Sequence, residues 1–294
     1  MLRIALDRHP KSAIAKNLAP LSAIFQSALD LRRVEYARDH TSRQADQRIA
    51  VLEDAANVVA LKMIYKLNDG AFRPVFSQLL EWSVSKTPGV DSRGRAVRQE
   101  SVFGFLLFFF DKLKSIVTSY ATYVIDSAVG VLQSADLTTG EQRELWKRVL
   151  RTLAKCFEHD QEDFWQTPSH FDAVAPALLG QFLHAPTMDV SEELVPAVVE
   201  LAAAAHSQEH RKELNGGILA HLRSGRAAVR LAAVKCEQAL TDRLGEEWLE
   251  MLPEMLPYIS ELQDDDDEVV DRETHRWIVK IEGVLGESLD AMLQ

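Results

Sequence analysis

A repeat of about 40 residues in the last third of the chain constrains the fold more than any other sequence feature. Apolar residues recur at this spacing, and armadillo and HEAT repeats have periods of roughly 40–47 residues. Each such repeat is a pair of helices that buries its apolar face only against neighbouring repeats. The three series that carry the period are Leu179–Leu219–Ile259, Phe182–Leu222–Leu262 and Val229–Val269.

Helical spacing of apolar residues extends through the remainder of the sequence. Ile49, Leu52, Ala56, Val59 and Met63 follow steps of three and four residues, as one buried face of a helix requires. Alternating patterns typical of strands are scarce. The sequence therefore predicts an all-α fold, an α-solenoid of HEAT/armadillo-like helix pairs.

Turn signals divide the expected helices. An acidic turn, Asp264–Asp267, is expected to precede the last helix, because Asp favours helix N-termini. Val102–Phe110 is the most apolar run, but it is far shorter than the ~20 residues that span a bilayer, so a buried helix and no membrane partner are expected. The turn signals are Asn68-Asp69-Gly70, Thr87-Pro88-Gly89, Thr138-Thr139-Gly140-Glu141, Thr167-Pro168-Ser169, Ala185-Pro186-Thr187 and Asn215-Gly216-Gly217.

The charge is unevenly distributed along the chain. Of a net charge of −11, residues 240–294 carry −12, from 16 acidic and 4 basic residues, which leaves +1 for the rest. A general attraction to nucleic acid is therefore not expected, although a local basic patch fits the neutral part. Cys156 and Cys236 lie far apart without a CxxC motif, as expected of two core thiols in a reducing compartment.

The sequence contains no complete motif for catalysis or cofactor binding. His206-Ser-Gln-Glu-His210 matches an inverted zinc-peptidase motif, but it follows an alanine-rich helix and reads as a solvated turn. An EF-hand starting at Asp264 would need Gly and Glu where Val269 and His275 stand. Glycine-rich phosphate loops are absent. We therefore expect no enzyme, no cofactor, no metal and no small-molecule substrate.

Two basic clusters and one acidic cluster are the candidate binding sites. The first basic cluster ends the longest loop, and the second recurs at four-residue steps along one helix, where it could follow phosphates. Solvated surface, or pairing with Glu141 and Glu144, is the alternative. The acidic turn is either a helix cap or a partner-docking site. The candidates for RNA contact are Arg93, Arg95, Arg98, Arg143, Lys147 and Arg151, and those for partner contact are Asp264, Asp265, Asp266 and Asp267.

Two segments carry a family resemblance. Leu67–Phe76 with the following Leu79–Trp82 resembles the opening of the C-terminal domain in a family of giant HEAT-repeat nucleolar proteins. These are the U-three small nucleolar RNA-associated protein ten, or HEAT-repeat-containing protein one, family. Leu252–Leu262 and Glu282–Glu287 are similar to that family's last repeat and terminus. The resemblance covers about residues 50–294, and its middle depends on helical character alone.

The resemblance implies a non-enzymatic scaffold of the small-subunit processome. Such a protein acts in ribosome biogenesis, in pre-rRNA transcription and 18S rRNA maturation, through contacts with other processome proteins in the nucleus and nucleolus. It also implies the end of preceding repeats in residues 1–45, a family-specific helical domain in 46–166, and HEAT-like repeats with a C-terminal cap in 167–294.

Two alternatives remain open. In the first, the chain is a direct RNA-binding module that contacts pre-rRNA or small nucleolar RNA through its basic loop and helix surface. This alternative predicts that Arg93 and the Arg143 stripe lie on one face. In the second, the chain is a transport adaptor of karyopherin type, which would not explain the Phe72-Arg73-Pro74 segment.

Overall fold

The computed structural model describes residues 2–38, 43–290 and 292–293, and every regular element within them is helical. Helices α1 to α5 form the N-terminal end, and five helix pairs follow. The N-terminal helices are α1 (Leu2–Arg8), α2 (Lys11–Lys16), α3 (Leu18–Leu29), α4 (Leu31–Arg38) and α5 (Arg43–Ile64). The pairs are α6 (Asp69–Val84) with α7 (Ser92–Lys112), α8 (Val117–Ser134) with α9 (Gly140–Glu158), α10 (Pro168–Leu179) with α11 (Ser191–Ala204), α12 (Gln208–Leu222) with α13 (Ala227–Leu244), and α15 (Leu252–Leu262) with α16 (Glu268–Leu285).

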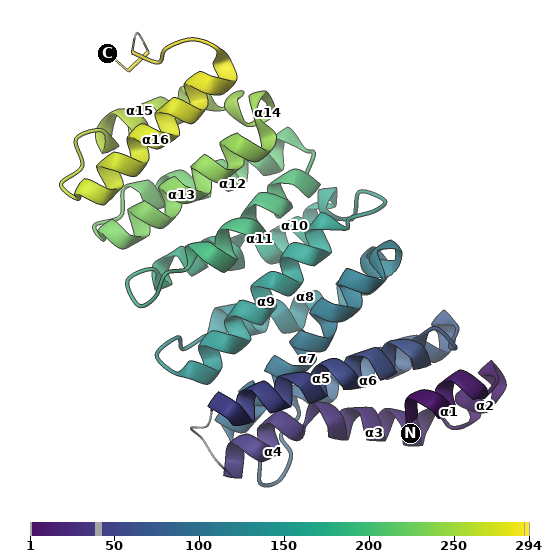
Figure 1. Cartoon of the computed structure of the whole chain (residues 1–294). Helices are drawn as coiled ribbons and strands as arrows, with labels where there is room; N and C mark the ends of the chain where they lie inside the picture. Colours follow the sequence, from purple (N-terminus) through teal and green to yellow (C-terminus); the bar gives the residue numbers. More distant parts are fainter. Residues whose placement is uncertain (1, 39–42, 291, 294) are drawn as a thin grey trace.

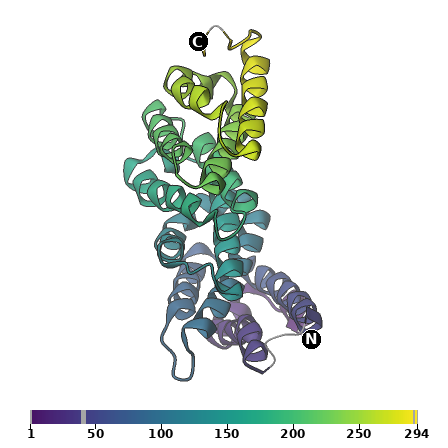
Figure 2. The same cartoon turned by 90° about the vertical axis from the view of Figure 1, so that its left-hand side faces the viewer.

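The pairs stack into two rows. The second helices α7, α9, α11, α13 and α16 contact one another in series, and the first helices α6, α8, α10, α12 and α15 form the other row. Figure 1 looks onto the row of second helices, and Figure 2 shows the stack from the side. Contacts between successive second helices are more extensive than those between successive first helices. The predicted all-α solenoid of helix pairs is confirmed.

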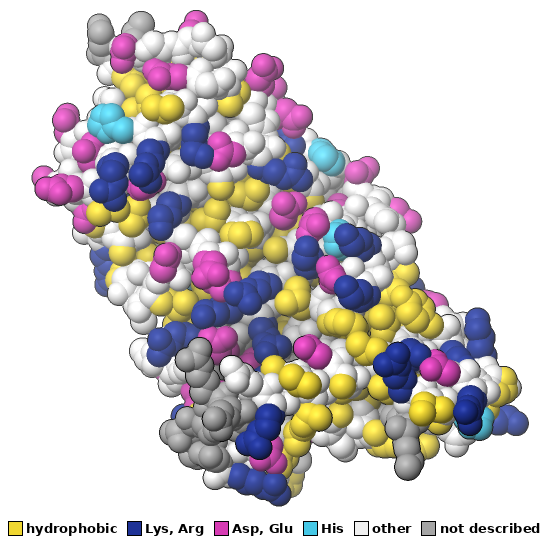
Figure 3. Space-filling view, viewed as in Figure 1, with side chains coloured by type: hydrophobic (Ala, Val, Ile, Leu, Met, Phe, Trp, Pro, Cys, Tyr) yellow, Lys and Arg dark blue, Asp and Glu magenta, His cyan; other side chains and the backbone are white. Residues whose placement is uncertain are grey.

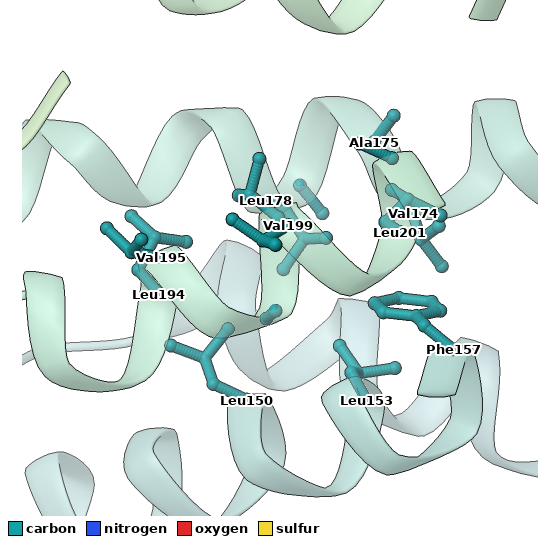
Figure 4. Close-up of a cluster of buried hydrophobic side chains, with 14 of the residues drawn as sticks. Leu150, Leu153, Phe157, Val174, Ala175, Leu178, Leu194, Val195, Val199 and Leu201 are labelled. Atoms are coloured by element: carbon teal, nitrogen blue, oxygen red, sulfur yellow. The ribbon is translucent and has the colours of Figure 1, made fainter. Parts of the chain in front are cut away.

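One continuous apolar core runs between the rows, from Leu29 to Leu289. Figure 4 shows it where α9, α10 and α11 meet, with Leu150, Leu153 and Leu178 among the side chains that fill the space between these helices. These side chains are fully buried, and burial of each such side chain contributes about 1.5–3 kcal/mol. The stack is therefore held by nearest-neighbour apolar contacts, as in other repeat proteins.

Buried tryptophans add directional contacts between successive helices. The indole nitrogen of Trp146 in α9 donates to Gln181 Oε1 at 2.8 Å, and that of Trp277 in α16 donates to Thr241 Oγ1 at 3.1 Å. Trp248, in the short helix α14 (Glu246–Leu249), donates to Glu237 Oε2 at 2.9 Å. These bonds satisfy indole groups that would otherwise be buried without a partner.

The 40-residue period is correct for the first helices but shifts by one residue at the last pair. Leu219 and Ile259 are both buried, whereas Val229 is buried and Val269 is 38% exposed. Val270 takes the buried position in α16. The pairing of Val229 with Val269 is therefore wrong, because the turn before α16 is one residue longer than the period implies.

The predicted turn at Asn215-Gly216-Gly217 is also wrong, since these residues lie inside α12. A Cβ on Gly217 would come within 2.4 Å of Leu179 Cδ1, so the glycine allows α10 and α12 to approach closely. His221 Nε2 lies 2.9 Å from the Leu179 carbonyl oxygen at the same contact. This glycine serves helix packing rather than a turn.

The apolar run Val102–Phe110 lies in the C-terminal half of α7, with most of its side chains in the core. A different stretch of the described chain, Lys114–Ser134, is long enough and apolar enough to cross a membrane, judged by length and composition alone. Its Val117, Val124, Ala128 and Leu132 are buried within the stack, where α8 contacts α6, α9 and α10. This helix therefore packs as a core element of the solenoid.

Candidate functional site

Two adjoining grooves lie between α4, α5, α7 and α9. The first has a volume of about 890 Å³ and is lined by Arg93, Arg143 and Lys147 among others. The second, of about 500 Å³, is lined by Lys147, Arg151 and Lys155. Because Lys147 lines both, the two grooves meet along α9, and we call them together the α9 groove. Figure 3 shows basic side chains gathered over this region with acidic ones among them.

Helix α9 positions its basic residues by its amphipathic pattern. Arg143, Lys147, Arg151 and Lys155 recur every fourth residue, so their Cα atoms are about 6 Å apart along the axis. The opposite face carries Trp146, Val149, Leu150 and Leu153, all of which are buried. Packing of that apolar face into the core therefore turns the basic stripe toward the groove.

Arg93 reaches the same groove from the first turn of α7. Asp91 caps this helix by accepting a hydrogen bond from the Gly94 amide at 2.7 Å, so Arg93 and Arg95 lie on the helix rather than in the loop. Arg93 is 60% exposed, pairs with Glu141 of α9 and donates to the Tyr36 hydroxyl at 3.0 Å. Arg95 donates to the Val90 carbonyl at 3.2 Å.

Arg98 does not reach the surface, so its predicted contact with RNA is wrong. Its side chain is 2% exposed, donates to Asp30 Oδ1 at 2.9 Å and lies 4.6 Å from the centre of the Trp82 ring. Burial would raise the pKa of Asp30, but hydrogen bonds from Arg33 and Arg98 lower it. The sequence carried a signal, because Arg98 lies four residues before the fully buried Val102 on the same face of α7.

Most cations of the α9 groove already have carboxylate partners. Arg151 bonds Glu193 of α11 at 2.7 Å, and Lys147 bonds Glu144 at 3.1 Å. Burial raises the pKa of Glu193 despite the charge of Arg151. Arg143 donates only to backbone carbonyls among the described residues. The groove is therefore of mixed charge, and Arg143 is the cation in it that is most available to a ligand.

A buried charge cluster beneath the groove was not anticipated from the sequence. Arg32 of α4 donates to both carboxylate oxygens of Glu53 at 2.9 and 2.8 Å and lies 3.5 Å from Glu100. Arg148 of α9 lies 3.3 Å from Glu100 on the other side. Burial is the largest cause of the raised pKa of Glu100. These contacts tie α4, α5, α7 and α9 together and fix the groove walls.

The acidic turn is divided between internal contacts and solvent. Asp267 caps α16 by accepting hydrogen bonds from the amides of Val269 and Val270 at 3.0 and 3.2 Å. Asp265 pairs with Arg230 at 2.7 and 2.6 Å. Asp264 and Asp266 are exposed. Two of the four residues predicted for partner contact are therefore occupied internally: Asp265 joins the last two helix pairs, and Asp267 caps α16.

The two histidines of the zinc-like motif lie in different environments. His206 is exposed in the turn after α11, whereas His210 is buried in α12 and stacks on Phe171 with ring centres 4.1 Å apart. No group of three potential metal ligands occurs in the part of the chain that the structure describes.

Comparisons with known proteins connect the chain to one family. The family model of the BP28CT (NUC211) domain matches residues 13–165. The U3 small nucleolar RNA-associated protein 10 of Chaetomium globosum is 61% identical over 294 residues, which is 100% of this chain and 17% of that protein. The protein of the same name from Neurospora crassa is 60% identical over 296 residues and is covered to 16%. The chain thus spans about a sixth of the length of these curated relatives.

Among solved structures, a designed armadillo repeat protein is similar at 16% identity, with a TM-score of 0.42. The similarity covers 76% of this chain and 87% of that one. At this level the likeness carries no argument about function.

Proposed function

The chain belongs to the BP28CT (NUC211) domain family, and from that membership we propose that it is a non-enzymatic scaffold of the small-subunit processome in ribosome biogenesis. The observation that carries this proposal is the match over the whole chain, at 61% identity, to a U3 small nucleolar RNA-associated protein. We extend the proposal to a role in pre-rRNA transcription and 18S rRNA maturation, to processome proteins as partners, and to the nucleus and nucleolus as the site of action.

The geometry suits a scaffold because stacked helix pairs present a long surface of fixed spacing. Ion pairs bridge successive pairs on this surface, as between Arg151 and Glu193 and between Lys280 and Asp242. Partner proteins bound at different pairs would be held at set separations. The division into residues 1–45, 46–166 and 167–294 stays a prediction, since the apolar core is continuous across both boundaries.

A chimera tests the scaffold proposal. In Neurospora crassa, the matching segment of the U3 small nucleolar RNA-associated protein 10 would be replaced by this chain or deleted. We expect the chimera to restore 18S rRNA and the deletion to accumulate unprocessed pre-rRNA, as measured by northern blotting. Normal 18S rRNA in the deletion strain would refute a requirement for this region.

A second candidate function is direct contact with pre-rRNA or small nucleolar RNA. It is supported by the α9 groove, which places Arg93 from α7 beside Arg143 and Lys147 from α9. Its cations lie on one face, as an RNA-binding module requires. The carboxylates beside them weaken the attraction, so we place this function second.

RNA binding is tested by fluorescence anisotropy with labelled single-stranded and structured RNA. If about five cations contact phosphates, affinity should fall about a hundredfold between 50 and 200 mM salt. The double variant Arg143→Gln with Lys147→Gln should reduce the salt slope by about two. Lys212→Gln with Arg272→Gln, at exposed positions that line neither groove, is the matched control. No binding at 50 mM salt would leave protein docking as the task of this region.

A further inference from the structure

A separate groove opens in the row of first helices, between α6 and α8, with α7 and α9 forming its floor. We call it the outer groove; its volume is about 500 Å³. Buried side chains of Leu80, Val131 and Leu145 form its apolar part, and Val84, 48% exposed, stands at its edge. The residues that line it are Leu80, Glu81, Val84, Gln99, Tyr123, Asp126, Ser127, Gly130, Val131, Ser134, Gln142 and Leu145.

The outer groove is acidic, and its carboxylates are available. Glu81 and Asp126 are exposed, and no Lys or Arg of the described chain pairs with either. Glu81 accepts only a long hydrogen bond, 3.3 Å, from the Ser77 hydroxyl. By contrast, most acidic residues of the α9 groove have basic partners. A ligand with a positive charge would find two free carboxylates here, whereas a nucleic acid would be repelled.

The outer groove also holds hydrogen-bonding groups that this chain leaves unused. Gln99 and Gln142 are half-buried and make no side-chain hydrogen bond within the described residues. The Ser127 hydroxyl is buried in the wall without a partner. A glutamine amide both donates and accepts, as does the backbone of an extended peptide. Buried groups of this kind are normally satisfied, so a bound peptide backbone would complete them.

Gly130 indicates the space that such a backbone would fill. It lies inside α8, where glycine costs roughly 0.5–1 kcal/mol relative to alanine. Gly104 and Gly217 make room for Arg148 and Leu179 of this chain, but a Cβ on Gly130 would meet no atom within 4 Å. The space above Gly130 is therefore open, and Gly130 is one of the residues that line the groove.

We propose that the outer groove binds an extended polypeptide segment carrying Lys or Arg next to an apolar residue. The basic side chain pairs with Glu81 or Asp126, the apolar one packs on Val84 and Val131, and Gln99 and Gln142 bond the peptide backbone. This inference depends on the scaffold proposal, because it supplies the surface on which a partner protein docks.

The test uses two fluorescein-labelled decapeptide pools with flanks randomised over Gly, Ser, Ala and Asn. One pool has a fixed central Arg-Leu and the other a fixed central Glu-Leu. We expect the Arg-Leu pool to bind at least fivefold more tightly by anisotropy. Methyl NMR of the complex should shift Leu80, Val84, Val131 and Leu145. Equal affinity for both pools, or shifts elsewhere, would overturn the proposal.

Two sets of variants localise the binding. Gly130→Phe should fill the groove and abolish binding, whereas Gly130→Ala should retain it while slightly stabilising α8. Glu81→Arg with Asp126→Arg should transfer the preference to the Glu-Leu pool. Asp172→Arg with Glu213→Arg, both exposed on the same row of helices, is the matched control. Binding that survives both Gly130→Phe and the charge reversal would rule out this groove.

The peptide-binding test and the chimera test can fail independently of each other. Restored 18S rRNA without peptide binding would reject the outer groove alone. Peptide binding by a chain that fails to restore 18S rRNA would instead reject its assignment to the processome.

Discussion

Replacing Arg32 with Met is expected to destabilise the N-terminal half of the solenoid by about 3–5 kcal/mol, because it leaves the buried Glu53 without its cation and Glu100 with Arg148 alone. Glu53 and Glu100 are 6% and 7% exposed and share Arg32 between them. Burial would raise the pKa of Glu53, but Arg32 and Ser101 hold it below its usual value. Among the described residues, the Ser101 hydroxyl alone would still bond Glu53 in the variant, at 2.8 Å.

Urea unfolding of the wild type and the variant measures this loss. Arg38→Met is the control on the same helix, because Arg38 is 71% exposed and, among the described residues, pairs with Glu35 alone; its effect should stay below about 1 kcal/mol. The difference between wild type and Arg32→Met should shrink as the pH falls toward 4, where the unpaired Glu53 carboxylate becomes protonated. Equal stability of the two variants would show that the buried cluster does not support the fold.

Glu237→Gln is expected to stabilise the protein by roughly 2–4 kcal/mol at pH 8. Burial raises the pKa of Glu237 from 4.5 to about 8, against the opposing hydrogen bond from Trp248. The folded state thus binds this proton more tightly than the unfolded state. The contribution of Glu237 to the free energy of unfolding is fully present below pH 4.5. It is lost as the pH rises to about 8, by roughly 5 kcal/mol in total. Glutamine does not ionise and so avoids this loss, but its unpaired amide costs about 1–3 kcal/mol. The net gain is the difference between these two free energies.

The measurement is urea unfolding of both proteins at several pH values from 4.5 to 8.5. The stability difference should be small or reversed at the acid end and should grow with pH. Subtracting one protein from the other cancels the titration of all other groups. Glu254→Gln, at an exposed position of α15, should show no such trend. A difference independent of pH would mean that Glu237 is ionised in the fold.

The solenoid was predictable from sequence because the period and the helical spacing are local signals. Leu219, Leu222, Ile259 and Leu262 are all buried as their repeat requires. The failures arise from tertiary contacts. Gly217 suggested a turn, but the absent Cβ makes room for Leu179 in another helix. No local pattern could show that contact, since the two residues belong to different helix pairs.

The candidate sites were predictable only in part. The four-residue spacing placed Arg143, Lys147 and Arg151 correctly on one face of α9, and capping chemistry suggested the acidic turn. Charge alone could not distinguish the exposed Arg93 from the buried Arg98 five residues later. The outer groove gave no signal at all, because its lining comes from four helices and consists largely of residues without a motif.

The unequal packing of the two rows determines how the molecule deforms. Successive second helices are in close contact, whereas successive first helices touch more sparsely. The row of second helices is therefore the stiff axis of the stack, and elastic bending takes place mainly by opening or closing the gaps between first helices. Bending of the whole solenoid would thus change the width of the gap between α6 and α8. A segment wedged in that gap would resist closure and set the curvature of the molecule.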